Sequence, residues 1–195
     1  MTLRYRELRG DRLRAALDDL ARLRIAVFRA WPYLYDGDMD HERGYMRNYA
    51  DNDRAILVAA LDGERIVGAS TGTPMEDHAD GLRAPFEATG ISPTDVFYCA
   101  ESVLLPAWRG QGAGHAFFDR REAFGRELGR RHAAFCGVIR PDDHPLRPPE
   151  YRPLDGFWTA RGYARLPKAV ARFSWKDVDQ AQATEKDLQF WIKNL

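Results

Sequence analysis

Three glycines in five positions, Gly110, Gly112 and Gly114, stand where an apolar stretch gives way to a helix-like run. Glycine inside a helix costs about 1 kcal/mol relative to alanine, so its use here needs a reason. At a helix start, glycines expose successive backbone N–H groups at the positive end of the helix dipole. Segment 109–114 therefore predicts an anion site that suits a pyrophosphate.

Two better-known glycine motifs do not fit this segment. A P-loop requires Gly-Lys-Ser/Thr, and no such lysine is present. The dinucleotide pattern G-x-G-x-x-G fails because its third glycine slot holds His115 or Phe117. What remains is Arg109 and Gly112 followed by Gly114, between a predicted strand and a predicted helix.

Glu101 is the carboxylate best placed for acid–base work, since it lies on the predicted strand 95–105 that leads to the glycines. It could accept a proton as a general base, or make a structural hydrogen bond at a strand edge. The sequence "GASTG", 68–72, matches a serine nucleophile elbow with Asp142 and His144 downstream. However, Thr73-Pro74 follows it instead of a helix, so a serine hydrolase is a remote alternative.

An acidic loop follows the first predicted helix, and two tyrosines that could wall a pocket, Tyr33 and Tyr35, flank its start. Its acids could attract a cationic amine. They could equally form a solvated loop in which Asp38 or Asp40 caps the next helix. The four acids are Asp36, Asp38, Asp40 and Glu42.

The hydrophobic periodicity predicts that these residues belong to one domain of class α/β (α+β). We expect a strand at 2–8, a helix ending near Trp31-Pro32, a second helix to about residue 50, and a hairpin at 55–73. A short helix near 81–88, the strand 95–105, a helix at 112–128 and a strand at 132–139 follow. After a Pro-rich loop at 140–153 come a short helix and final strands. The predicted sheet is mixed and mostly antiparallel, with helices on both faces.

Composition limits the classes of function. The 195 residues suit one domain, and 29 basic against 29 acidic residues give no surplus charge for general nucleic-acid binding. No apolar run approaches a membrane span or a signal-peptide core. Cys99 and Cys136 are expected as small buried hydrophobes in a reducing compartment, and no third ligand beside His132 and Cys136 suggests a metal. A cytoplasmic protein is the expectation.

The segment "SVLLPAWRGQGAGHAFFDRREAFGRELG" resembles the acyl-CoA-binding segment of the GNAT superfamily of N-acetyltransferases. That family's signature is Arg or Gln, two residues, Gly, one residue, and Gly or Ala; Arg109, Gly112 and Gly114 meet it. The resemblance covers roughly residues 2–176, so 177–195 is expected as a C-terminal amphipathic extension. It implies transfer of an acetyl group from acetyl-CoA to a primary amine, without a metal, by a monomer or a homodimer.

The resemblance also implies roles. The turn would hold the CoA pyrophosphate through Arg109, Gly110, Gln111, Gly112, Ala113 and Gly114. The strand end would pair with the pantetheine arm and polarise the thioester carbonyl through Val103, Leu104 and Leu105. Glu101 would be the base, and the acceptor, a small cationic amine, would enter beside Tyr33, Tyr35, Asp36 and Asp38.

The sequence does not identify the residue that protonates the thiolate. Trp158 occupies the slot where the family commonly has a tyrosine, and an indole N–H cannot act as an acid near neutral pH. Tyr151, His144 or bulk water would take that part. Trp158 could instead contact the cofactor or be a core aromatic, and its presence keeps open a catalytically silent acyl-CoA-binding or sensory domain.

Overall fold

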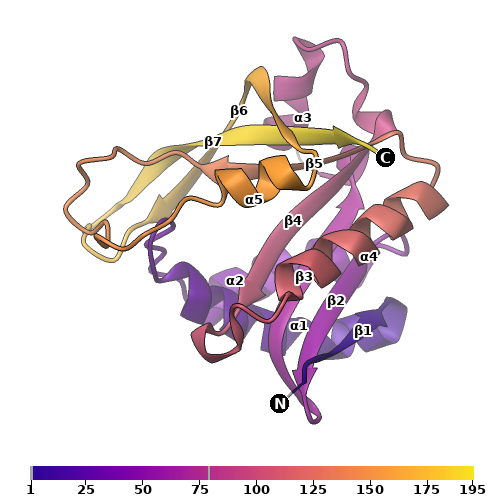
Figure 1. The fold of residues 1–195 in the computed structure, drawn as a ribbon, viewed down its shortest axis with the longest axis horizontal. Helices are drawn as coiled ribbons and strands as arrows, with labels where there is room; N and C mark the ends of the chain where they lie inside the picture. Colours follow the sequence, from indigo (N-terminus) through magenta and orange to yellow (C-terminus); the bar gives the residue numbers. More distant parts are fainter. Residues whose placement is uncertain (1, 79) are drawn as a thin grey trace.

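The computed structural model describes residues 2–78 and 80–195. Seven strands form one sheet in the order β1-β2-β3-β4-β5-β7-β6 (Figure 1). The strands are β1 (Arg4–Leu8), β2 (Ile56–Asp62), β3 (Arg65–Pro74), β4 (Val96–Leu104), β5 (His132–Val138), β6 (Ala164–Lys176) and β7 (Ala183–Asn194). The helices are α1 (Gly10–Phe28), α2 (Met39–Ala50), α3 (Asp80–Glu87), α4 (Ala113–Glu127) and α5 (Asp155–Ala160). Short 3₁₀ turns are η1 (Met75–Asp77), η2 (Pro93–Asp95) and η3 (Pro106–Trp108).

Helices cover both faces of the sheet, as the periodicity predicts. Strand β2 shows why, because its alternate side chains enter two different cores. Ile56 and Val58 pack with α4, whereas Leu57 and Ala59 pack with α1 and α2. Helix α5 shares the α4 face, and α3 covers β5, β6 and β7 on the other face. Figure 1 shows α4 and α5 in front of the sheet, with α1 and α2 behind it.

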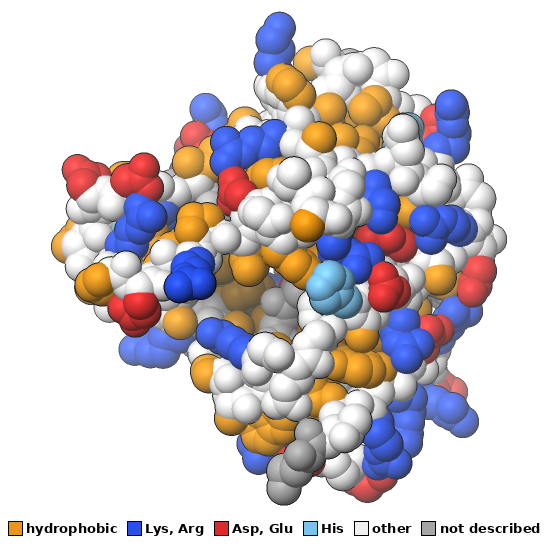
Figure 2. Space-filling model, in the orientation of Figure 1, with side chains coloured by type: hydrophobic (Ala, Val, Ile, Leu, Met, Phe, Trp, Pro, Cys, Tyr) orange, Lys and Arg blue, Asp and Glu red, His pale blue; other side chains and the backbone are white. Residues whose placement is uncertain are grey.

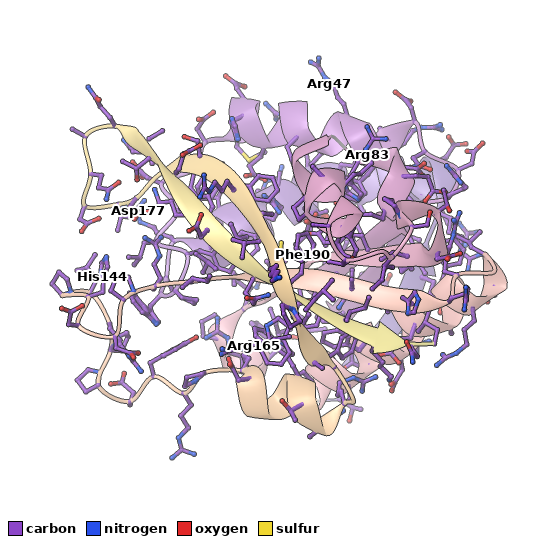
Figure 3. All side chains as sticks on the ribbon, turned by 90° about the horizontal axis from the view of Figure 1, so that it is seen from above. Arg47, Arg83, His144, Arg165, Asp177 and Phe190 are labelled. Carbon is purple, nitrogen blue, oxygen red and sulfur yellow. The ribbon has the colours of Figure 1, made fainter. Side chains whose placement is uncertain are left out.

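The C-terminal residues form part of this sheet. Strand β7 pairs with β5 on one side and β6 on the other, so the expected boundary at residue 176 divides a hairpin. The amphipathic pattern of the tail is that of a strand, because its alternate side chains are buried. Phe190 lies near the middle of the molecule (Figure 3). The predicted extension is therefore an internal strand.

The sheet opens between β4 and β5, which is its one parallel pair. Three residue pairs join these strands, ending at Tyr98 and Ala134, although each strand continues further. We call the space between 99–104 of β4 and 135–138 of β5 the wedge. Figure 2 shows a hollow near the middle of the corresponding face.

A β-bulge in β4 lies where the wedge opens. Ser70 pairs with Ser102, but the next pair joins Gly72 to Cys99. One residue of β3, Thr71, therefore opposes two residues of β4, Ala100 and Glu101. Such an insertion bends the strand and re-aims its side chains. Consequently the strand that was predicted as regular over 95–105 changes face at Glu101.

Candidate active site

The glycine-rich turn has the backbone that the sequence predicts. Gly110 and Gly112 have φ of 77° and 81°, in the region that disfavours L side chains. Gly112 is the N-cap of α4, and within the described chain no side chain caps this end. The first N–H groups of α4 are thus left for an anion.

Gly114 has a different role from the other two glycines. Its φ is ordinary, but an added Cβ would lie 3.1 Å from Cζ of Phe157 in α5. The first turn of α4 therefore lies close to α5. Ala113, the residue before Gly114, is buried. Gln111 and Arg109 are exposed on the turn, and the Arg109 Nε atom donates to the Leu104 carbonyl over 3.3 Å.

The strand end before the turn is anchored to β3. The N–H group of Leu105 donates to the carbonyl of Val67 over 3.0 Å, while Val103 is buried towards α1 and α2. The predicted cofactor residues 103–105 and 109–114 therefore form one continuous run at the mouth of the wedge. Their contact with CoA stays a prediction.

Trp158 packs as a core aromatic on the α4 face of β5. Its ring centroid lies 4.9 Å from that of Phe135 and 5.2 Å from that of Trp191. The ring also covers Gly137, where an added Cβ would meet it at 3.1 Å. Trp158 is only partly buried and borders the wedge from this side.

Glu101 lies on the opposite face, towards α1 and α2, and its side chain is 2% exposed. Its Oε2 atom is 3.0 Å from Nη1 of Arg24 and 3.4 Å from the hydroxyl of Tyr45. Its Oε1 atom is buried, and no described residue donates a hydrogen bond to it. One oxygen of the carboxylate is thus fixed and the other is unsatisfied.

Arg24 connects Glu101 to a second buried acid, Glu42. The Arg24 Nε atom donates to Glu42 over 2.6 Å, and the Glu42 side chain is 0% exposed. Burial opposes the charge of Arg24, but Glu101, Tyr45 and Glu42 together hold its pKa above the ordinary value. We call Glu42, Arg24 and Glu101 the buried triad. Two carboxylates against one guanidinium leave it one negative charge when all three are ionised.

Tyrosines surround this triad. Tyr98, at the point where β4 and β5 part, lies with its hydroxyl 3.1 Å from Sγ of Cys136 on β5. Burial raises the pKa of Cys136 to about 12, so the thiol stays neutral. Burial also raises the pKa of each of these phenols above its ordinary value: Tyr33, Tyr45, Tyr98 and Tyr151. This side of the wedge therefore offers neutral hydroxyls around one carboxylate.

The acidic loop is largely neutralised. Asp36 pairs with Arg29 at 2.8 Å and Lys176 at 2.6 Å. Asp38 caps α2, since it accepts from the backbone N–H groups of Asp40 and His41. Asp40 is exposed and lies 3.6 Å from Arg43, and Glu42 belongs to the buried triad. The structure supports the helix-start interpretation of this loop over the electrostatic one.

The two tyrosines beside the acidic loop also have structural partners. Tyr35 forms a backbone bridge with Asp177, and burial raises its pKa. The Tyr33 ring packs on Phe28 and faces Trp175. Both tyrosines border the triad, Tyr33 near Arg24 and Glu101, and Tyr35 near Arg24 and Glu42.

The loop 140–153 is tied to the connection between α1 and α2. Arg140 donates to the carbonyls of Pro32 and Tyr33 over 2.8 and 2.6 Å, and pairs with the buried Asp177. Trp31 packs against the rings of His144 and Tyr151. Figure 3 shows His144 out on this loop and Asp177 on the neighbouring C-terminal segment. Together these segments border the side of the wedge on which Glu101 lies.

Arg24 was not predicted, and Glu42 was predicted only as an acid of the loop, not as a buried partner of Arg24. Both had one usable signal, since a charged residue on an apolar helix face needs a buried partner. Arg24 follows Leu20 by four positions, and Glu42 precedes Met46 by four. Tyr45 and Tyr98 carried no local signal, because their partners Glu101 and Cys136 are distant in sequence.

The remaining alternatives lack a suitable geometry in the described residues. Ser70 of "GASTG" is 0% exposed in the middle of β3, not at a strand–helix turn. Over residues 2–78 and 80–195, no group of three or more His, Cys, Asp or Glu side chains could hold a metal. Likewise, no helix of the described chain has the length and apolar character to span a bilayer.

Comparison with known proteins identifies a family. A family model described as "Acetyltransferase (GNAT) family" matches residues 19–148. No curated protein matches.

Solved structures share the fold at low identity. An acetyltransferase from Streptococcus agalactiae has 14% identity and a TM-score of 0.59, over 100% of this chain and 99% of that one. A ribosomal-protein-alanine N-acetyltransferase from Brucella melitensis has 13% identity and a TM-score of 0.60, over 97% and 99%. The PaiA N-acetyltransferase from Thermoplasma acidophilum, solved with coenzyme A, has 9% identity and a TM-score of 0.56, over 100% of both chains.

Proposed function

Since the chain belongs to the GNAT family of acetyltransferases, which use acetyl-CoA, we propose that it acetylates a small cationic primary amine with Glu101 as the base. The observation that carries this proposal is the wedge. It has an uncapped helix start on one side and an unsatisfied, buried carboxylate oxygen on the other.

The turn supplies the CoA side of the reaction. N–H groups at the start of α4, freed by the positive φ of Gly110 and Gly112, suit the pyrophosphate. Strand residues 103–105 lead from the bulge to this turn, which suits a pantetheine arm running along β4 into the wedge. A backbone N–H group there would polarise the thioester carbonyl.

Glu101 suits the base because one oxygen is free. Arg24 and Tyr45 hold Oε2, which fixes the carboxylate plane and leaves Oε1 to accept a proton, directly or through a water. Glu101 first takes one proton from the ammonium group, and the neutral amine nitrogen then attacks the thioester carbon. A C–N bond forms and the C–S bond breaks; the thiolate gains a proton from the acid, and the second proton of the nitrogen replaces the one that the acid has given.

Tyr151 is our candidate for the acid that protonates the CoA thiolate. Burial raises its pKa, so the phenol keeps its proton at neutral pH. Its ring also packs against Trp31, two residues before Tyr33, which supports a location near the triad. His144 is a weaker candidate, because its Nδ1 already accepts from the backbone of Leu146; bulk water remains the other source.

The charge of the acceptor follows from the buried triad. Its net negative charge favours a cationic amine, and the tyrosine faces around it favour cations as well. The closed wall formed by 31–33 and 140–153 favours a small molecule over a folded protein. The acidic loop, which first suggested a cation, contributes less because its charges are paired.

An amine panel tests the proposal. Acetyl-CoA is incubated with polyamines, aromatic amines, amino acids and a neutral hydroxylated control, and released thiol is measured. Turnover with cationic amines supports the proposal. If calorimetry detects acetyl-CoA binding but no amine is acetylated, the result would instead support a catalytically silent acyl-CoA-binding domain. Trp158 is the reason for considering this alternative, because it replaces the usual tyrosine.

A further inference from the structure

Arg121, on α4, is a buried cation whose contacts are all to uncharged groups. It is 1% exposed, and within residues 2–78 and 80–195 no carboxylate forms an ion pair with it. Its guanidinium lies 4.8 Å from the Phe118 ring centroid. Such a group is costly to bury unless its donors are satisfied, so its hydrogen bonds indicate what it does.

Those hydrogen bonds converge on the β-bulge. Nη1 donates to the carbonyls of Thr71 and Glu101, both over 3.2 Å, and Nη2 donates to the Ser102 hydroxyl over 2.9 Å. Nε donates to the Phe117 carbonyl one turn back on α4. Thr71 lies at the register shift on β3, and Glu101 lies opposite it on β4. The regular ladder of backbone hydrogen bonds is disrupted at this point.

The bulge decides which way Glu101 points. Phe97 and Cys99 face α4, and in a regular strand Glu101 would face α4 too. The extra residue reverses this order, so that Ser102 turns towards Arg121 while Val103 enters the α1–α2 core. Glu101 consequently meets Arg24 on the acceptor face.

We propose that Arg121 is a positioning residue that holds the bulge in β4 and thereby aims Glu101 at the acceptor. This inference rests on the proposed function of Glu101 as the base. Helix α4 begins at the anion site and carries Arg121 about two and a half turns further on. One helix therefore aligns the cofactor turn and, through the bulge, the base.

The test is a double-mutant cycle between Arg121→Met and Glu101→Gln. Met keeps the length and apolar stem of the side chain but has no donor. Arg120→Met is the matched control, because Arg120 is the adjacent residue and its side chain is 38% exposed. It contacts Glu7 at 3.5 Å and the Tyr5 ring at 5.8 Å, both away from the bulge. Acetyl-CoA affinity by calorimetry, kcat with the best amine, and the pH dependence of kcat are measured for each variant.

We expect Arg121→Met to lower kcat by about tenfold or more. It should also reduce the rise of kcat with pH that reports ionisation of Glu101, and that Glu101→Gln abolishes. Acetyl-CoA affinity should stay within about twofold, since the turn is intact. In the Glu101→Gln background, Arg121→Met should change kcat by less than about twofold, because both changes remove the same contribution. Arg120→Met should behave like the parent.

Equal effects of Arg121→Met in both backgrounds would overturn the inference and leave Arg121 a purely structural residue. If Arg121→Met does not fold, Arg121→Lys carries the test. Lysine keeps the charge but lacks the fork that reaches two carbonyls, so it should restore folding and only part of kcat. Full kcat in a folded Arg121→Lys would also overturn it. Parent-like turnover of Glu101→Gln alone would instead remove the proposed base, and the inference with it.

Discussion

The two sides of the wedge are built by different means. The turn at 109–114 is backbone, largely exposed, and shaped by positive φ at two glycines. The side that we propose for the acceptor consists of buried side chains from α1, α2, β4 and β5, held by a charge network around Arg24. A site made of backbone needs a local sequence, whereas a site made of side chains needs the whole fold. The two sides should therefore respond differently to mutation, salt and pH.

The largest effect should come from Glu101→Gln. This change keeps the shape and removes the base, so turnover should fall by roughly 10²–10⁴ at neutral pH, with acetyl-CoA affinity kept. Steady-state kinetics across pH together with calorimetry measure both. Unchanged turnover at neutral and high pH alike would reduce Glu101 to a structural residue.

The next largest effect should be on the free energy of unfolding, which mutations on the two sides of the wedge should change by different amounts. Arg24→Met leaves two buried carboxylates without their cation, and we expect the free energy of unfolding to fall by about 3–5 kcal/mol. Arg109→Met, at the exposed turn, should change it by less than about 0.5 kcal/mol. Urea unfolding compares them. Similar losses for both variants would contradict the distinction between a buried and an exposed side.

The CoA side is tested by charge at one glycine. Asp and Asn both tolerate positive φ, so Gly112→Asp and Gly112→Asn differ mainly by a negative charge at the helix start. We expect acetyl-CoA affinity to be about 30-fold lower for Asp than for Asn, equivalent to about 2 kcal/mol. Calorimetric titration of both folded variants decides this. Equal affinities would move the pyrophosphate away from the turn.

Acid should destabilise the folded protein through His78. His78 packs on Tyr98, and burial lowers the pKa of His78 from 6.5 to about 4. Between these values the unfolded chain binds a proton that the folded chain does not. The free energy of unfolding should therefore fall as pH drops from about 6.5 to about 4, by at most about 1.4 kcal/mol per pH unit.

Two histidine variants check that assignment. His78→Gln should flatten this part of the stability curve measured by urea unfolding. His115→Gln, which alters an exposed histidine on the CoA side, should leave it unchanged. A curve with the parent's slope in His78→Gln would assign the pH dependence to another group.

The smallest effect should come from the acidic loop. Replacing Asp36, Asp38 and Asp40 with Asn keeps a good helix cap and removes only paired or exposed charges. The KM for the amine should stay within about twofold of the parent at low salt. A large rise in that KM, lost at high salt, would restore the loop as the feature that attracts the acceptor.

The predictability of each part follows the same division. Periodicity located the strands and helices, and the glycine turn was recognisable because positive φ restricts the residue type. The bulge was not predictable, because "CAES" has the pattern of a regular strand, and Arg121, which hydrogen-bonds to the bulge, is twenty residues away from Glu101. The triad escaped for the same reason. Residues 177–195 were predicted as an extension, because an amphipathic pattern does not show which strands a segment will pair with.

The position of β7 has a consequence for the order in which the molecule assembles. Among the seven strands it is the last in the chain, yet it fills a gap between β5 and β6. Until it is available, β5 lacks its antiparallel neighbour, and the contacts that close the sheet are distant in sequence, which slows folding. Asp177, which pairs with Arg140 of the loop 140–153, lies between β6 and β7. The glycine turn at 109–114 can thus form early, whereas the side that we propose for the second substrate is completed last.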